Sequence, residues 1–246
     1  MNALEQLAAT YVLNASWQFP LIYLVCLGVL HIWRDMPARL QHWACLACAL
    51  LAAVLPVTAV LGLFTDGRAE PVEAMPVTIP VYILRTILAA FSVLCVCRAW
   101  QLVRAGLQTR DLRRRATPAI SIDPTASPIL QQAREQGVEI LVSPANIECF
   151  GPLLAGVRGR VILIPRMLTD AANAHLLEAA IAHELAHVRR KDMLLFLVSE
   201  LMMIPLSFHP VAERLRRRLA ESRELACDER VLGDGMDRFK YARCLL

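Results

Sequence analysis

Two histidines with a glutamate beside the first are the residues of this 246-residue chain that most directly suggest chemistry. They form the string His183-Glu184-Leu185-Ala186-His187. Because four residues advance about 400° along a helix, His183 and His187 would share one face, with both imidazoles about 2 Å from a single ion. Glu184 would project beside them, where a carboxylate can take a proton from an attacking water. The string therefore predicts zinc binding and hydrolytic chemistry.

A catalytic zinc site also needs a third protein ligand and one open position. The helix-like segment 211–232 contains ELACD, in which Glu224 and Asp228 are four residues apart and so share a face. Glu224 can complete the coordination, and Asp228 can accept the second ring N–H of a ligand histidine. Glu221 is the rival third ligand. A solvated acidic face paired with arginines is the alternative to any metal role for this segment.

The HELAH string must lie on a helix, and its neighbours have helical spacing. Leu177, Ile181 and Leu185 recur at intervals of four, and Thr169 or Asp170 can cap the start of the helix. The spacing therefore predicts one amphipathic helix that carries both histidines.

Two short segments rich in apolar and β-branched residues precede this helix and predict strands, at 138–143 and 159–164. The second is a near-continuous apolar run that stops at Pro165, and we expect it to be an edge strand against which an extended peptide substrate can pair. Arg160, Ile162 and Ile164 on it are the candidate substrate-binding residues.

The composition adds a membrane part to this domain. The chain is 57% hydrophobic and 20% charged, with a mean hydropathy of +0.46, and the apolar excess lies in the first 105 residues. These values argue against a disordered chain, a secreted disulfide scaffold and a purely soluble enzyme. Three stretches are apolar and long enough to cross a bilayer, at about 8–33, 42–64 and 80–100.

Arginines set the expected orientation. A group of them follows the third span, from Arg98 to Arg115. By the positive-inside rule, the N-terminus lies outside and everything after Arg98 is cytoplasmic, in a multi-pass protein of the cell (inner) membrane. A basic cluster beside an apolar span favours contact with the lipid bilayer over direct nucleic-acid binding.

These observations predict a fold class and a domain organisation. We expect a membrane α-helical N-terminal bundle (1–105), a basic juxtamembrane segment and linker (106–137), and a cytoplasmic α+β zincin-like metallopeptidase domain (138–246). We expect that domain to continue beyond Leu246, because the chain stops within a helical pattern.

The segment Met193–Phe208 is apolar enough to suggest a fourth span, but Glu200 and Pro205 interrupt it. One crossing there would also place His183 and Glu224 on opposite sides of the membrane. We therefore expect this segment to stay cytoplasmic, as a core helix or as a helix lying against the bilayer.

The chain resembles the BlaR/MecR family of membrane zinc metallopeptidases, a gluzincin-type group. The resemblance covers nearly all of the chain and rests on the three spans, VILIP (161–165), HELAHVRRKD (183–192), FHP (208–210) and ELACD (224–228). It implies a site with the following residues: His183, His187 and Glu224 as zinc ligands, Glu184 as general base and Asp228 as a supporting partner.

The resemblance also implies a regulatory role. In that family the substrate is a cytoplasmic repressor or the protein itself, and an extracellular antibiotic-sensing domain triggers cleavage. This chain contains no such domain, so we expect either a fragment or a separate sensor. One feature departs from related zincins: no histidine follows His209, which leaves Tyr241, Arg243 or a group beyond Leu246 to stabilise the oxyanion.

The leading prediction is an integral-membrane zinc metalloendopeptidase with a cytoplasmic active site, which regulates a signal by cutting a transcriptional repressor or itself. A CAAX-type or housekeeping membrane metallopeptidase is the second enzyme interpretation. The non-enzyme alternative is a membrane signalling scaffold in which zinc is structural or absent.

Overall fold

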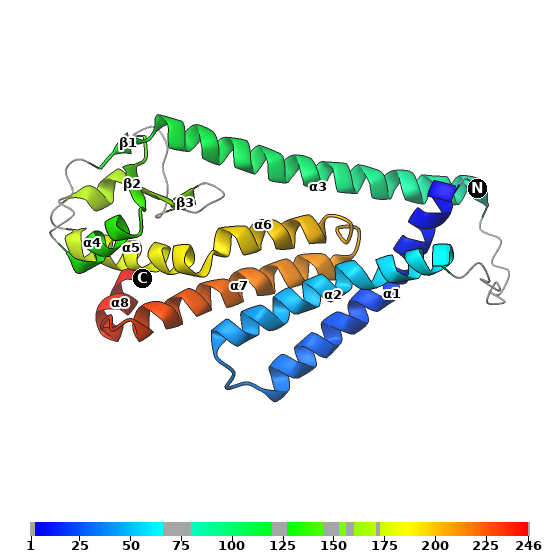
Figure 1. Cartoon of the computed structure of the whole chain (residues 1–246), viewed down its shortest axis with the longest axis horizontal. Helices are drawn as coiled ribbons and strands as arrows, with labels where there is room; N and C mark the ends of the chain where they lie inside the picture. Colours follow the sequence, from blue (N-terminus) through cyan, green and yellow to red (C-terminus); the bar gives the residue numbers. More distant parts are fainter. Residues whose placement is uncertain are drawn as a thin grey trace. The chain divides into compact units, whose positions relative to one another are not determined.

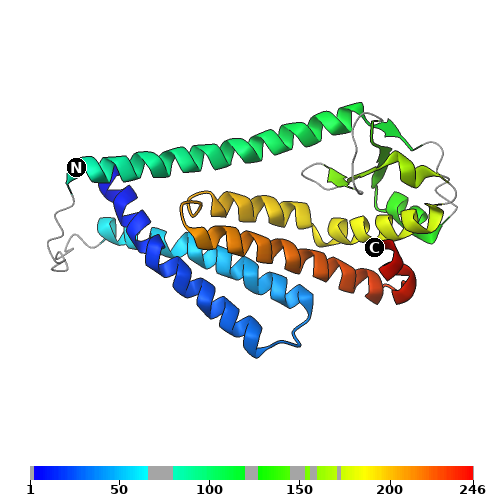
Figure 2. The ribbon, with the colours of Figure 1, turned by 180° about the vertical axis from the view of Figure 1, so that it is seen from behind.

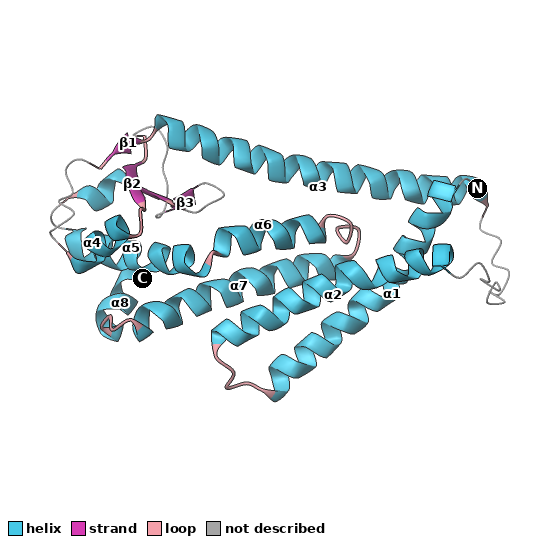
Figure 3. Ribbon diagram, viewed as in Figure 1, coloured by secondary structure: helices cyan, strands magenta, loops and turns pink. Residues whose placement is uncertain are grey.

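A computed structural model describes residues 3–65, 80–119, 127–144, 153–155, 160–170 and 173–245. Most of these residues are helical (Figure 3). The strands of a small sheet follow the third helix and precede the fifth helix along the chain. The chain divides into two compact units. The membrane unit is Met1–Gln101 with Ser199–Ser222, and the site unit is Leu102–Val198 with Arg223–Leu246.

Among the described residues, three helices are long and apolar enough to cross a membrane. They are α1 (Ala3–Ile32), α2 (Ala38–Thr65) and α3 (Val81–Arg115). The three predicted stretches are thus helices: α1 begins earlier than predicted, α3 ends later, and α2 is longer at both ends. The segment 66–79 between the second and third of these helices lies outside the described residues. Orientation in the membrane stays a prediction.

Helices α1 and α2 lie side by side as a hairpin (Figures 1 and 2). Small side chains fill much of their shared core, including Ala15, Cys45 and Ala52, which are almost fully buried. Small residues let helix backbones approach closely where lipid supplies no hydrophobic driving force. Apolar side chains such as Leu13 and Leu24 remain exposed on the outside of the pair, as a lipid-facing surface requires.

The segment after the HELAH helix forms a helical hairpin, α6 (Asp192–Met203) and α7 (Pro210–Gly233). The two helices run antiparallel, since Glu200 pairs with Arg216 at 3.1 Å and Phe196 lies under the Arg223 guanidinium. Pro205 lies in the turn between them. The tip of the hairpin packs with α1 and α2 in one core, through Met203, Leu206, Val211, Ala212, Leu215 and Leu219.

This packing differs from the expected division of the chain. Residues 199–222, which we placed in the domain 138–246, share their core with the first two apolar helices. The apolar segment after the HELAH string is not one long helix, because the chain turns back after α6. The two antiparallel helices bring Asp192 and Glu224 to one pocket.

The described part of the site unit contains a four-stranded sheet in the order β1-β2-β4-β3. They are β1 (Thr117–Pro118), β2 (Glu139–Val142), β3 (Leu153–Ala155) and β4 (Val161–Ile164). Strands β2 and β4 are parallel, whereas β1 and β3 pair antiparallel with them. The two predicted strands are β2 and β4, and the two short outer strands were not predicted.

Strand β4 is buried on both faces, which its continuous apolar run explains. Ile162 and Ile164 pack in a core with α4 (Pro128–Glu135) and α5 (Ala174–Arg190), whereas Val161 and Leu163 pack near Leu112 at the end of α3. The sheet thus holds α5 by its apolar face.

The expectation that β4 is an edge strand is wrong. It pairs with β2 on one side and with β3 on the other, so its backbone is not free for a peptide. Ile162 and Ile164 are fully buried core residues, and the exposed Arg160 lies just before the strand. Arg160, Ile162 and Ile164 therefore do not offer a free strand edge to a substrate. Among the described strands, the outer position on this side of the sheet belongs to β3.

Candidate metal centre

Helix α5 carries the two histidines and is fixed from its opposite face. Leu177, Ile181 and Leu185 on that face are buried against the sheet. The helix begins at Ala174, so the predicted cap at Thr169 or Asp170 is wrong: a 3-10 turn (Arg166–Thr169) occupies that position. It ends at Arg190, and the left-handed backbone of the next residue, Lys191 (φ 58°), turns the chain into α6.

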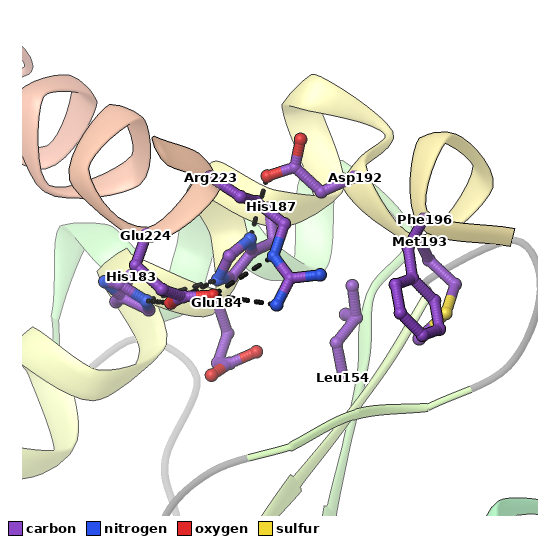
Figure 4. Close-up of a pocket in the computed structure, with 9 residues that line it drawn as sticks. All are labelled: Leu154, His183, Glu184, His187, Asp192, Met193, Phe196, Arg223 and Glu224. Carbon is purple, nitrogen blue, oxygen red and sulfur yellow. Dashed lines mark hydrogen bonds and ion pairs between the residues drawn. The ribbon is translucent and has the colours of Figure 1, made fainter. Parts of the chain in front are cut away.

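Three potential ligand atoms from two helices converge on one point (Figure 4). Nε2 of His183 lies 3.2 Å from Nε2 of His187, and Oε2 of Glu224 on α7 lies 3.2 Å from the first and 3.5 Å from the second. A tetrahedral ion with bonds of about 2.0–2.1 Å places its ligands roughly 3.3 Å apart. The three mutual distances match that spacing, so these residues fit zinc in both type and geometry.

The rival ligand Glu221 is not part of this cluster, and its side chain is exposed. Hydrogen bonds with His183 and His187 hold the pKa of Glu224 well below its ordinary value, although burial opposes them. A carboxylate that stays ionised between two imidazoles favours a positive charge at this point.

The other ring nitrogen of His187 is held by two buried groups. Its Nδ1–H donates to Oδ2 of Asp192, the first residue of α6, at 2.8 Å. The Cys227 thiol donates to the same oxygen at 3.2 Å, and Arg190 contacts this carboxylate at 3.1 Å. This pattern fixes the tautomer that presents Nε2 of His187 to the ion.

Neighbouring groups shift the pKa values of both His187 and its partner Asp192. Burial alone would lower the pKa of His187, but hydrogen bonds with Asp192, Cys227 and Glu224 raise it. Burial would raise the pKa of Asp192, and its bonds to His187 and Cys227 together with the Arg190 charge lower it instead. Asp192 is therefore an anion behind the histidine.

His183 has a different pair of partners. Its Nδ1–H donates to the Tyr241 hydroxyl at 2.8 Å, and this hydroxyl donates to Oδ1 of Asp228 at 2.6 Å. Oδ1 of Asp228 also lies 3.1 Å from the same Nδ1. Tyr241 comes from the last helix, α8 (Arg238–Leu245), and is buried. Burial and the Asp228 carboxylate raise the pKa of Tyr241 well above its ordinary range.

A pocket of about 350 Å³ opens in front of the three ligands (Figure 4). Its described lining is formed by the following residues: Leu154, His183, Glu184, His187, Asp192, Met193, Phe196, Arg223 and Glu224. Glu184 is 8% exposed, and burial raises its pKa although both histidines lower it. A carboxylate with a raised pKa beside an open ligand position suits a general base that later returns a proton.

The structure thus brings together all five residues expected at the metal centre. Among the predicted substrate-binding residues, Arg160, Ile162 and Ile164 do not line the described pocket. Of the two oxyanion candidates, Tyr241 lies behind His183, and the exposed Arg243 is not among the lining residues either.

The structure also adds four residues that the sequence argument left without a role: Asp192, Cys227, Arg223 and Leu154. Asp192 and Cys227 lie inside the strings HELAHVRRKD and ELACD, so their position beside the predicted ligands was the available signal. Leu154 lies on a strand too short to carry a pattern.

A comparison with protein families now decides the assignment. The family model described as BlaR1 peptidase M56 matches residues 10–246, nearly the whole chain. The chain belongs to the BlaR1 peptidase M56 family. The resemblance to BlaR/MecR proteins is thereby confirmed, and an M56 membrane metallopeptidase is what the helices and the ligand cluster describe. Among curated proteins, none matches the chain significantly.

Proposed function

We propose that this M56 protein is a zinc metalloendopeptidase that hydrolyses peptide bonds at the pocket between α5 and α7. The observation that carries the proposal is the convergence of His183, His187 and Glu224 at zinc spacing, with buried Glu184 beside them on an open pocket. A structural zinc is enclosed by four protein ligands, whereas this cluster draws three from the described residues and opens on a pocket. That difference favours an enzyme over a scaffold.

Zinc, when bound, would supply a Lewis acid that polarises the scissile carbonyl and acidifies water. The chain's own residues do the rest. Glu184 accepts the proton of the attacking water and transfers it to the nitrogen of the leaving amine. Asp192 holds His187 in one orientation, and the pair Tyr241 and Asp228 holds His183. Fixed imidazoles keep the reacting groups in place with little reorganisation.

The substrate would pair with β3 instead of β4. Strand β3 bonds to β4 along one side, and among the described strands none pairs with its other side. Leu154 of β3 lines the pocket opposite the ligands. An extended peptide that adds to this edge would present its backbone to the metal position, and Met193 and Phe196 offer an apolar surface for a side chain.

We also propose on which side of the membrane the pocket lies and which substrate it cuts. Arginines from Arg98 to Arg115 follow the third apolar stretch, so we propose that the pocket faces the cytoplasm of a cell-membrane protein. By analogy with the family, the substrate would be a cytoplasmic repressor or the protein itself, under the control of a sensor. Terminal-peptide mapping of cells that carry the wild type or an inactive variant would distinguish these substrates from the prenylated C-termini cut by a CAAX-type enzyme.

The test of the chemistry is Glu184→Gln, with Glu178→Gln as the matched control on the same helix. The protein is purified in detergent with zinc, and cleavage of itself and of a peptide library is followed by mass spectrometry. We expect both variants to keep their zinc, and Glu184→Gln alone to lose cleavage by at least about 100-fold. Equal cleavage by wild type and Glu184→Gln would remove the proposed mechanism.

A further inference from the structure

Arg223 is the one arginine among the described residues that line the pocket, and the proposed mechanism gives it no role. Arg223 directly precedes the ligand Glu224 on α7, and about a quarter of its side chain (26%) is exposed. A peptidase must stabilise the negative charge that develops on the carbonyl oxygen of its substrate. Tyr241 is unavailable for this, because its hydroxyl is bound behind His183 to Nδ1 and to Asp228.

The Arg223 guanidinium is held from two directions. Its Nε and Nη2 donate to Oε1 of Glu224 at 3.1 and 3.0 Å, and its central carbon lies 5.7 Å from the centre of the Phe196 ring. A planar guanidinium is well suited to one carboxylate along its edge and one aromatic ring against its face. The two contacts fix the group without using all of its donors.

The two carboxylate oxygens of Glu224 have different partners. Its Oε2 faces the two histidines, and its Oε1 faces Arg223. The Glu224 carboxylate therefore lies between the Arg223 guanidinium and the metal position. Nη1 of Arg223 donates to none of the described residues, so it has two N–H groups for a substrate.

The direction of the side chain matches the expected path of the substrate. Figure 4 shows the guanidinium reaching past the Glu224 carboxylate into the pocket, toward Leu154. A peptide paired with the edge of β3 would carry its scissile carbonyl between Leu154 and the ligand cluster. A charged donor in a partly enclosed site of this kind acts more strongly than it would in water.

We propose that Arg223 is a catalytic residue that donates through Nη1 to the carbonyl oxygen of the substrate as that oxygen becomes negative. The inference rests on the proposed peptidase function and assigns the oxyanion role within it. Arg223 takes no proton and forms no covalent bond in this step. Its charge lowers the energy of the tetrahedral intermediate relative to the bound peptide.

The test measures how tightly two derivatives of one dipeptide, leucyl-tryptophan, bind to the zinc-loaded protein in detergent. An N-phosphoryl derivative carries tetrahedral anionic oxygens like those of the intermediate. A mercaptoacyl derivative binds the metal through sulfur and has no such oxygens. The variants are Arg223→Gln and Arg223→Lys, with Arg230→Gln, an exposed arginine of the same helix, as the matched control. Zinc affinity is measured alongside by chelator competition.

We expect Arg223→Gln to weaken the phosphoryl ligand by about 100-fold, the range found when one oxyanion donor is removed. Arg223→Lys should lower the affinity for the phosphoryl ligand by about 10-fold, because lysine keeps the positive charge but lacks the planar, forked N–H donors of arginine. Binding of the mercaptoacyl ligand and of zinc should stay within about threefold, because the Glu224 side chain is 46% exposed and water can replace the arginine at Oε1.

Two results would overturn the inference while leaving the peptidase function intact. Equal weakening of both ligands, or a large loss of zinc, would mean that Arg223 acts through Glu224 and does not touch the substrate. Failure of the zinc-loaded wild type to bind either ligand would instead overturn the proposed function, and this inference with it.

Discussion

His183 and His187 lie on one helix and face one point, but they are held from behind by different means. The support of His187 is Asp192, five residues away, together with Cys227, and both are almost fully buried. The support of His183 is Tyr241, more than fifty residues away, and Asp228, whose side chain is 30% exposed. The difference suggests that a rigid, buried anion fixes one ligand and a longer, more hydrated chain of bonds fixes the other.

Asp192→Asn should have the largest effect of the variants that test this comparison. The amide cannot supply the negative charge behind His187, and it leaves Arg190 without its ion pair. We expect zinc affinity to fall by about 100-fold, at the upper end for such supporting carboxylates. Chelator competition measures the affinity. A change of less than threefold would show that Asp192 does not position the ligand.

Asp228→Asn should have a smaller effect, of about 10-fold on zinc affinity. Tyr241 still reaches Nδ1 of His183 in this variant, and water has access to the site of the lost charge. The same competition assay applies. If the loss equals or exceeds that of Asp192→Asn, the proposed order of the two supports is reversed.

Tyr241→Phe removes one hydroxyl that bonds to both His183 and Asp228. Asp228 can then bond to Nδ1 directly, since its Oδ1 already lies 3.1 Å away. We expect zinc affinity to fall by no more than about fivefold, or about 1 kcal/mol for one net hydrogen bond. Thermal melting with and without zinc provides a second readout. A loss near 100-fold would make the tyrosine, and not the carboxylate, the main support.

Cys227→Ala should have the smallest effect on zinc. The thiol is a weak donor to Asp192, which keeps its bonds to His187 and Arg190 without it. We expect zinc affinity within about threefold of wild type, with some loss of thermal stability from the cavity that remains at a fully buried position. Cys227→Ser provides the control for side-chain size. Loss of zinc in both variants would indicate that the thiol is itself a ligand.

The sequence was sufficient to predict the convergence of the candidate ligands, because helical spacing is a local property. His183 and His187 are one turn apart in any helix, as are Glu224 and Asp228. The partner Asp192 was not predictable by spacing, since it depends on the left-handed turn at Lys191, which begins a new helix and returns a carboxylate to His187. Tyr241 depends on how α8 packs against α5, which no local pattern encodes.

The edge of the sheet and the hairpin were missed for a related reason. Strand β3 has three residues, too few for an alternating pattern, and its presence converts β4 from an edge strand into an inner one. The apolar segment after His187 was interpreted as a single helix that either crosses the membrane or does not. The contacts between α6 and α7, such as Glu200 with Arg216, show instead two antiparallel helices joined by a turn.

The zinc content of the detergent-purified protein tests the central claim that His183, His187 and Glu224 form one site. It should be measured for the wild type, His183→Ala and Glu224→Gln, with Glu221→Gln as the control one turn away on the same helix. We expect about one zinc per chain in the wild type and in Glu221→Gln, and far less in the other two variants. Zinc retained by Glu224→Gln but lost from Glu221→Gln, or a folded wild type that takes up no zinc, would contradict the account.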